Sequence, residues 1–298
     1  MARYLALHLH CGDEIAVQEC CGAAGFGRLA EMLGSGVTTG RHPAPAVELR
    51  TADSGRAGYE VYSSGHGGLS IRLTDGGSFE AVVAHGVPER IGPQMRLWHY
   101  LVICAGIGAV LRGIPAVLVH GAALMDGESA LLLCGDSGIG KSTTAARWEK
   151  LGRRVAADDM FLLECGDGGA FHIHSLPTWS RCADAPENTR FPADRALPVA
   201  GVLGLSRSRN GDRVAAVSRA EFFARIARSM FFHTSGIVKL LPVRHQRTFG
   251  SRLAALAGKV AEAFPPCGFF ADLNGDLAAA VTDYRVNFAG TAARVEDL

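Results

Sequence analysis

One run of residues has the types and spacing that hold a nucleotide phosphate. Gly135-Asp136-Ser137-Gly138-Ile139-Gly140-Lys141-Ser142 matches the pattern G-x-x-x-x-G-K-[ST] in full. Its glycines let consecutive backbone N–H groups turn toward one anion, while Lys141 can reach the outer phosphates and the Ser142 hydroxyl can bind Mg²⁺. Thr143 begins a helical stretch whose positive N-terminal end adds to the same site. The run therefore predicts binding of a nucleoside triphosphate, with ATP and Mg²⁺ as the expected cofactors.

The elements that must position this run lie on both sides of it. Residues 130–134 form an apolar strand-like stretch that ends at the glycines, and residues 143–149 have helical character. This strand–loop–helix context is the one that a phosphate-binding loop requires. An ordinary glycine-rich turn is the alternative that the context disfavours.

Two adjacent carboxylates follow the next predicted strand. Residues 153–159 form a short strand-like stretch that ends in Asp158-Asp159, after Gly152 as a helix cap. Since one helix and a turn separate this pair from Lys141, we expect the strand to return beside the first one, with its carboxylates at the phosphate end. The pair permits two tasks, holding Mg²⁺ and taking a proton from an attacking hydroxyl. Either aspartate alone could instead be a cap or turn residue.

Three motifs in order resemble the core of HPr kinase/phosphorylase and its relatives, which share a phosphoenolpyruvate-carboxykinase-type P-loop fold. The motifs are His120-Gly121, the glycine-rich run and Ala157-Asp158-Asp159. The resemblance implies that His120 lies near the phosphates and that Lys141 and Ser142 hold nucleotide and metal. It also implies that the two aspartates divide the tasks of base and metal ligand. We assign Asp158 as the base and Asp159 as a metal ligand beside Ser142.

The sequence departs from that family in two places. Thr143 stands where bacterial HPr kinases usually carry Glu. The glycine-rich signature associated with phosphoryl exchange on the carrier protein is not found, and the C-terminal third carries residues 236–241 instead. The carrier protein HPr is therefore not the expected acceptor. The chain is instead similar to divergent HPr-kinase-like proteins found beside peptide-modifying enzymes, such as the SynChlorMet cassette and lasso-peptide-associated groups.

The expected activity is transfer of the ATP γ-phosphoryl group to a hydroxyl of a peptide, a protein or a small molecule. Two alternatives remain open. The first is an ATPase or nucleotide-binding switch without an acceptor, which Thr143 in place of the family Glu favours. The second is a peptide-recognition module whose N-terminal part offers a strand edge. Relatives that assemble make a homo-oligomer plausible.

Composition excludes several partners. The net charge of +1 with 20% charged residues gives no electrostatic footprint for nucleic acid or an acidic membrane. The longest apolar stretch, residues 97–111, is too short for a bilayer span and predicts a buried helix. The first eight residues lack a signal-peptide pattern, so we expect a cytoplasmic protein.

The eight cysteines are scattered, which indicates reduced thiols. The nearest approach to a metal cluster is the set His8, His10, Cys11, Cys20 and Cys21, but it lacks a C-x-x-C pair and zinc is the disfavoured interpretation. His172 and His174 alternate along another strand-like stretch, for which a solvated face is the expected meaning.

The chain divides into two predicted parts of an α/β protein. Residues 1–95 form a small α+β domain, and residues 96–298 form an HPr-kinase-like nucleotide-binding domain with a mixed central sheet. The expected elements of the first part are strands at 4–9, 46–49, 59–62, 69–73 and 79–84 and a helix at 27–33. Those of the second part include strands at 116–120 and 199–206 and helices at 219–232 and 250–264.

Two groups of side chains in the last third allow both a functional and a structural interpretation. Arg181, Arg190 and Arg195 lie in an irregular segment, where one of them could stabilise charge on a transferring phosphoryl group, although surface arginines are the simpler interpretation. The doublets Phe222-Phe223 and Phe231-Phe232 are predicted to pack in the core rather than to stack on a base.

Overall fold

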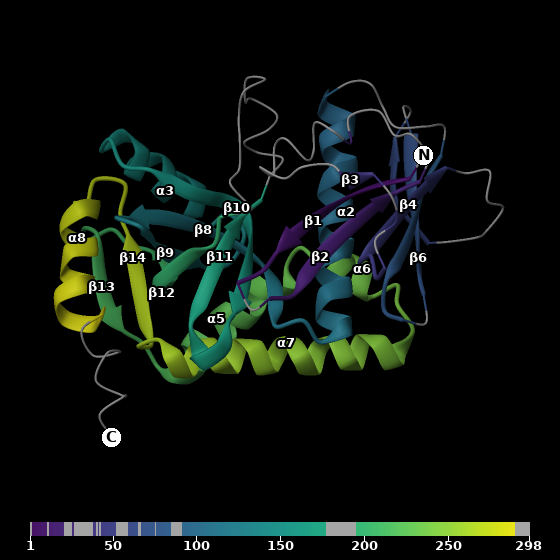
Figure 1. The fold of residues 1–298 in the computed structure, drawn as a ribbon. Helices are drawn as coiled ribbons and strands as arrows, with labels where there is room; N and C mark the ends of the chain where they lie inside the picture. The colour runs from purple at the N-terminus through teal and green to yellow at the C-terminus, as the bar shows by residue number, and fades with distance from the viewer. Residues whose placement is uncertain are drawn as a thin grey trace.

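Two seven-stranded mixed sheets, with helices between and around them, make up the protein (Figure 1). The computed structural model describes residues 2–289 except 11, 21–25, 27–37, 40, 42, 52–58, 65–66, 75, 85–90 and 177–194. The expected mixed α/β class is thereby confirmed. None of the helices in these described ranges is long and apolar enough to cross a membrane.

The first sheet has the strand order β3-β1-β2-β4-β7-β6-β5. Its strands are β1 (Arg3–His8), β2 (Glu14–Glu19), β3 (Thr38–Thr39), β4 (Val47–Thr51), β5 (Tyr59–Ser64), β6 (Gly67–Leu73) and β7 (Phe79–Ala84). Leu5 and Leu7 of β1 alternate with more exposed residues and are buried, as a sheet with one covered face requires. All five predicted strands are present, whereas β2 and β3 were not predicted. The helix predicted at 27–33 lies outside the described residues.

The second sheet has the order β11-β10-β8-β9-β12-β14-β13. Its strands are β8 (Ala116–Asp126), β9 (Ser129–Cys134), β10 (Val155–Cys165), β11 (Phe171–Ser175), β12 (Leu197–Arg207), β13 (Arg213–Ala216) and β14 (Cys267–Ala271). β12 runs parallel to both β9 and β14, while β8 is antiparallel to β9 and β10. The predicted strands at 116–120 and 199–206 are confirmed within β8 and β12.

Helices cover both faces of the second sheet, which is why β9 is apolar from Ala130 to Cys134. Leu131 and Leu133 of β9 belong to a cluster with α3 (Lys141–Lys150) and α8 (Leu277–Tyr284). Leu132 and Cys134 face the larger core, which includes α5 (Arg219–Phe231) and α7 (Val243–Ala263). The short helices are α6 (Ser235–Val238), η2 (Asp167–Gly169) and η3 (Arg285–Ala289).

One hydrophobic core joins the two sheets. It includes Leu5 and Val47 of the first sheet, Val117 and Leu132 of the second, and the helix α2 (Ile91–Arg112) between them. α7 runs beneath both sheets in Figure 1. The prediction of a buried helix at 97–111 is confirmed by α2, whereas the domain division at residue 95 stays a prediction.

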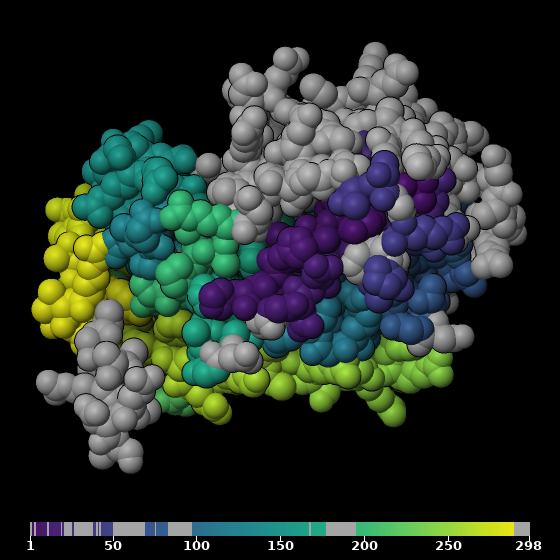
Figure 2. All heavy atoms as spheres, viewed as in Figure 1, coloured from purple at the N-terminus to yellow at the C-terminus, as the bar shows by residue number. Residues whose placement is uncertain are grey.

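The end of the first hairpin strand lies against the second sheet. The His10 N–H donates to a Glu164 carboxylate oxygen at 2.9 Å, and the His10 ring lies 4.2 Å from that of His172. In Figure 2 the purple N-terminal strands accordingly adjoin the teal strands of the second sheet. Glu164 also pairs with His174 at 2.9 Å, and both side chains are fully buried. The expected solvated face is therefore wrong for His174, because a buried carboxylate holds its ring.

The strand that carries the paired aspartates differs from the prediction. It does not end at Asp159 but continues to Cys165, because residues 160–163 are apolar and buried. It also pairs with β8 rather than with the loop strand β9. The carboxylates still reach the phosphate end, since Asp159 pairs with Gly121 and Gly121 pairs in turn with Cys134, the last residue of β9.

Candidate active site

The glycine-rich run forms a loop between β9 and α3. Gly138 and Gly140 have φ values of 73° and 117°, in the left-handed region that favours glycine. α3 begins at Lys141, two residues earlier than the helical stretch predicted. The first backbone N–H groups of a helix have no partner within it, so they are available to an anion at this end.

A buried serine of α5 holds the start of the loop. The Ser229 hydroxyl accepts a hydrogen bond from the Gly135 N–H at 2.9 Å. Further along the loop, the exposed Asp136 carboxylate lies 3.4 Å from the Arg228 guanidinium. The loop is therefore fixed by α5 on one side and continuous with α3 on the other.

Lys141 is the buried cation of the loop. Its ammonium is only slightly exposed and donates to the carbonyl oxygens of Gly135 and Asp136, both at 2.9 Å. Among the described residues it has no ion pair with a carboxylate, and burial lowers its pKa. A buried ammonium that lies next to helix amides without a partner in the helix fits a nucleotide phosphate.

Ser142 and Asp158 bring a hydroxyl and a carboxylate together at the start of α3. The Ser142 hydroxyl donates to the Asp158 carboxylate at 2.8 Å, and Asp158 is buried while Ser142 is exposed. A hydroxyl and a carboxylate are hard oxygen donors of the kind that Mg²⁺ prefers. The sequence assignment had Asp159 in this place; the structure puts Asp158 against Ser142.

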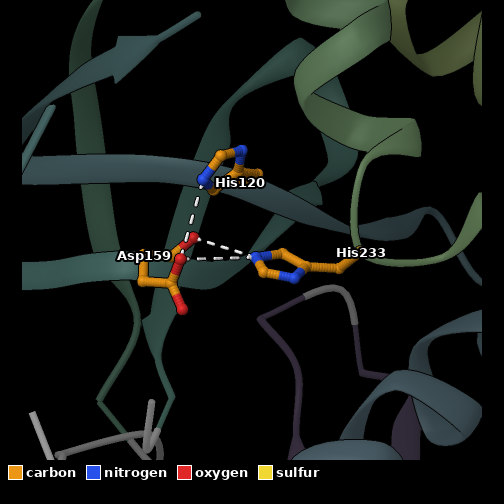
Figure 3. A group of neighbouring side chains, drawn as sticks. All are labelled: His120, Asp159 and His233. Carbon is orange, nitrogen blue, oxygen red and sulfur yellow. Dashed lines mark hydrogen bonds and ion pairs between the residues drawn. The ribbon is translucent and has the colours of Figure 1, made fainter. Parts of the chain in front are cut away.

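Asp159 instead faces two histidines (Figure 3). Its Oδ1 lies 3.6 Å from Nε2 of His120 and 3.8 Å from Nε2 of His233. The His233 ring also contacts the Asp159 backbone carbonyl oxygen at 3.1 Å. Asp159 has a φ of 79°, and it is the only non-glycine residue of the described ranges with positive φ. This unfavourable conformation costs free energy and is typical of functional sites.

Burial keeps the two imidazoles in their neutral form. It lowers the pKa of His120 to about 3, with Lys141 and His233 adding to the effect. Burial also lowers the pKa of His233, although Asp159 opposes the change. The pKa of Asp159 is raised, first by burial and then by the neighbouring Asp158 carboxylate. The group therefore carries little positive charge of its own at neutral pH.

Phe232 covers the His120 ring, at 4.0 Å between ring centroids. Of the two phenylalanine doublets, only Phe222 is fully buried, whereas Phe223, Phe231 and Phe232 are 36%, 37% and 45% exposed. The prediction of core packing is wrong for these three. Neighbouring helix residues point about 100° apart, so Phe222-Phe223 cannot place both rings on the buried face. Phe231 and Phe232, at the end of α5, line a pocket instead.

Two pockets flank the loop. The first, of about 570 Å³, lies on the α3 side and is basic, with Arg147, Arg207 and Arg209 in its lining. Two bonds of the Arg147 guanidinium to Asp212, at 2.5 and 3.2 Å, fix its position. The other residues that line it are Gly138, Ile139, Gly140, Thr143, Thr144, Ser208, Ala271, Asp272, Leu273 and Asn274.

The second pocket, of about 690 Å³, lies on the α5 side and is mainly apolar. Phe231 and Phe232 form its wall, His120 reaches it from β8, and Arg228 is the cation of its lining. The remaining lining residues are Gly135, Asp136, Ser137, Ala227, Ser235 and Leu253. Both pockets thus open on the same phosphate loop, one on each side.

Sequence reasoning did not find His233. Its neighbour in the site, Asp159, is 74 positions away, and the only local signal is a histidine directly after an aromatic doublet. Arg207 was also not singled out from the sequence. In the structure, Arg207 donates a hydrogen bond to the Gly138 carbonyl oxygen at 2.5 Å.

Other candidates lie elsewhere. Arg195 pairs with Glu128 at the surface, and Arg181 and Arg190 fall outside the described residues. His8 pairs with Glu14 at 2.8 Å. The zinc interpretation of the N-terminal cluster stays untested, because Cys11 and Cys21 are not described.

One comparison with known proteins shows the family of this chain. A search of curated proteins found no match. Among solved structures, the chain is similar to the HPr(Ser) kinase/phosphatase from Coxiella burnetii, with 14% identity over 34% of this chain and 77% of that one, and a TM-score of 0.23. The sequence model described as SynChlorMet cassette protein ScmC matches residues 91–257, more than half of the chain. The chain therefore belongs to the SynChlorMet cassette protein ScmC family.

Proposed function

We propose that this protein is a kinase that transfers the γ-phosphoryl group of ATP to a hydroxyl of a peptide, a protein or a small molecule. The observation that carries the proposal is the hydrogen bond between Ser142 and Asp158, which brings one of the two adjacent carboxylates directly against the glycine-rich loop. We also propose that the second sheet with this loop is a nucleotide-binding core of the HPr-kinase and phosphoenolpyruvate-carboxykinase type.

The α3 side of the loop suits the nucleotide. Lys141 and the first amides of α3 would bind the outer phosphates, and the arginines of the basic pocket would bind the remainder of the triphosphate. Ser142 and Asp158 would hold Mg²⁺, which when bound neutralises charge on the phosphate oxygens. We therefore reverse the sequence assignment of the two aspartates, with Asp158 as the residue at the metal.

The α5 side suits the acceptor. Its pocket begins at the same loop, and Phe231 and Phe232 offer an apolar surface for the part of the acceptor that does not react. Asp159 and His120 would orient the hydroxyl toward the γ-phosphate. Positioning is the main contribution of a protein to phosphoryl transfer, because the protein itself forms no covalent bond in it.

A nucleotide-dependent switch is the second candidate. Thr143 lines the basic pocket and supplies no carboxylate there, whereas the kinases that this sequence resembles usually carry Glu at that position. A site with one metal-side carboxylate fewer could bind and hydrolyse ATP without an acceptor.

Calorimetry with Mg²⁺ and ATP tests the nucleotide site first. Lys141→Ala removes the buried cation and is expected to weaken ATP binding at least about tenfold, equivalent to about 1.4 kcal/mol. Lys150→Ala, an exposed lysine at the other end of α3, is the matched control and should bind normally. Equal affinity in wild type and Lys141→Ala would contradict the nucleotide site.

Mass spectrometry and ADP release then separate the two candidates. Wild type is incubated with ATP and synthetic peptides that contain Ser, Thr or Tyr. A kinase yields phosphorylated peptide, and Asp158→Asn should lower its rate at least about 10²-fold, as expected for loss of a group at the transferring phosphate. ADP release without phosphorylated product in the wild type would instead favour the switch.

A further inference from the structure

One face of α5 carries an arginine and two phenylalanines that the core does not cover. Phe231 and Phe232 follow Arg228 by three and four residues, so the three side chains lie on the same side of the helical turn. All three are exposed, and all three line the apolar pocket beside the phosphate loop. This face therefore presents an apolar surface with a cation at its edge.

We propose that this face binds the acceptor as a peptide segment, in which the reacting hydroxyl is flanked by a large apolar side chain and by an Asp or Glu. The inference rests on the proposed function, because it identifies the class of acceptor for the same site. Phe231 and Phe232 contact the apolar side chain, and the Arg228 guanidinium pairs with the carboxylate. Arg228 is thus a residue that determines specificity for the acceptor.

The Arg228 guanidinium is held loosely beside the pocket. Its Nη1 lies 3.4 Å from the Asp136 carboxylate, and both side chains are 61% exposed. Its Nε donates to the Ala224 carbonyl oxygen, one turn earlier in α5, at 3.3 Å. A guanidinium has five N–H donors in a planar fork and can bind a carboxylate through two parallel hydrogen bonds. These two contacts therefore leave Arg228 enough donors for a carboxylate of the acceptor.

The helices around the pocket are strongly basic. Residues 219–264, which include α5, α6 and α7, contain eight Lys or Arg residues and two acidic residues, whereas the whole chain has a net charge of +1. A surface with an excess of one charge attracts a partner of the opposite charge and speeds its association. The charge of these helices thus complements an acidic peptide.

The exposure of the phenylalanines favours a peptide over a small molecule. Pockets for small molecules enclose most of their ligand, but Phe231 and Phe232 are 37% and 45% exposed. Aromatic and arginine side chains are enriched where proteins contact other chains. The same pocket reaches His120 and the start of the phosphate loop, so a peptide bound along α5 can place its hydroxyl there.

Steady-state kinetics with synthetic peptides tests the acceptor class. The peptides carry Ser with Leu and Asp placed within two residues on either side, and the best of them, the Leu/Asp peptide, is compared with versions that replace Leu by Ala or Asp by Asn. At saturating ATP, each replacement should raise KM at least about fivefold with little change in kcat, since these side chains bind away from the transferring phosphoryl group. Equal KM values would overturn the acceptor class and leave the kinase function intact.

Variants of α5 locate the binding face. Arg228→Gln should reduce the KM difference between the Asp and Asn peptides to about twofold or less. Lys259→Gln removes an exposed cation of α7 outside the pocket lining and should keep the difference. Phe231→Ala should reduce the preference for Leu over Ala, whereas Phe223→Ala, which removes an equally exposed ring of α5 outside the pocket, should keep it. Each preference is a ratio within one variant, so partial unfolding does not change it. Preferences that persist in Arg228→Gln and Phe231→Ala would overturn the proposal.

Fluorescence anisotropy of the labelled Leu/Asp peptide measures docking without phosphoryl transfer, in the presence of Mg²⁺ and a non-hydrolysable ATP analogue. Binding that Arg228→Gln weakens, without phosphorylated product in the kinetic assay, would support the docking face and contradict the proposed kinase activity. Absence of both binding and phosphorylation for all of the peptides would overturn the docking face, and phosphorylation of a small-molecule hydroxyl in the same assay would show that the kinase function stands without it.

Discussion

Gly121 has no room for a side chain. A Cβ at this position would lie 2.7 Å from Cε1 of Phe161 and 2.9 Å from the carbonyl oxygen of Leu133. Gly121 pairs with Asp159 on one side and with Cys134 on the other. The absence of a side chain therefore lets the aspartate strand and the loop strand pack closely on either side of β8, next to His120.

The first prediction concerns this contact. Gly121→Ala should lower the free energy of unfolding by about 1–3 kcal/mol, because the added methyl group overpacks a region that includes backbone. Gly250→Ala, at an open position within α7, should instead raise it by up to about 1 kcal/mol through better helix propensity. Urea unfolding of the two variants and wild type measures both changes. Equal stability of Gly121→Ala and wild type would show that β8 can shift to make room.

At the level of elements, α7 stabilises the end of α2. Nη1 of Arg252 donates to the carbonyl oxygens of Val110 and Leu111, the former at 2.9 Å. Carbonyl groups in the last turn of a helix have no partner within the helix, and a cation also interacts favourably with the negative end of its dipole. α2 then leads through a short turn into β8, so this contact helps to fix the strand that carries His120.

Removal of the contact between Arg252 and the end of α2 should lower the stability of the protein. Arg252→Ala is expected to lower the free energy of unfolding by about 0.5–1.5 kcal/mol, since two carbonyl groups and the helix dipole lose a cationic partner. Arg247→Ala, an exposed arginine on the same helix, is the control and should change stability little. Urea unfolding measures both variants. If the two lose the same amount, general charge on α7 and not the contact with α2 explains the effect.

Most elements that surround the site could be predicted because their signals are local. The glycine-rich run, the apolar strand before it and the helix after it are contiguous in sequence, and β9 and α3 confirm them. β10 continues beyond Asp159 to Cys165, although paired carboxylates predict the end of a strand. His233 and Phe232 could not be placed, since the packing of α5 on β8 brings them to His120 and no short-range pattern records that contact.

For the molecule as a whole, one core joins the two sheets, and imidazole groups that ordinarily titrate near neutral pH are buried in the folded protein. His99 of α2 is one of them, and its Nδ1 is buried without a hydrogen-bond partner in the described part of the protein. Burial, with a contribution from His233, lowers the pKa of His99 from its ordinary value of 6.5 to about 4. The folded protein must therefore keep this ring neutral while the unfolded chain protonates it.

The third prediction follows from this difference. Between pH 4 and 6.5 the unfolded state binds more protons at His99, so the free energy of unfolding falls as the pH is lowered. The contribution is fully present above pH 6.5 and amounts to at most about 3 kcal/mol. Urea unfolding of metal-free protein from pH 4.5 to 8 should show a smaller pH dependence in His99→Asn than in wild type. Identical slopes would mean that water reaches the ring in the folded protein.

The backbone of Asp159 also restricts which residues mutation and selection can place there. A φ of 79° is open to Gly and Asn but unfavourable for Ala and strongly so for β-branched residues. Single-base changes of an Asp codon lead to Gly, Asn, Ala and Val, among others, and only the first two fit this conformation readily. A saturation library screened for folded protein should thus enrich Gly and Asn at position 159, while a screen for phosphorylated product should recover Asp.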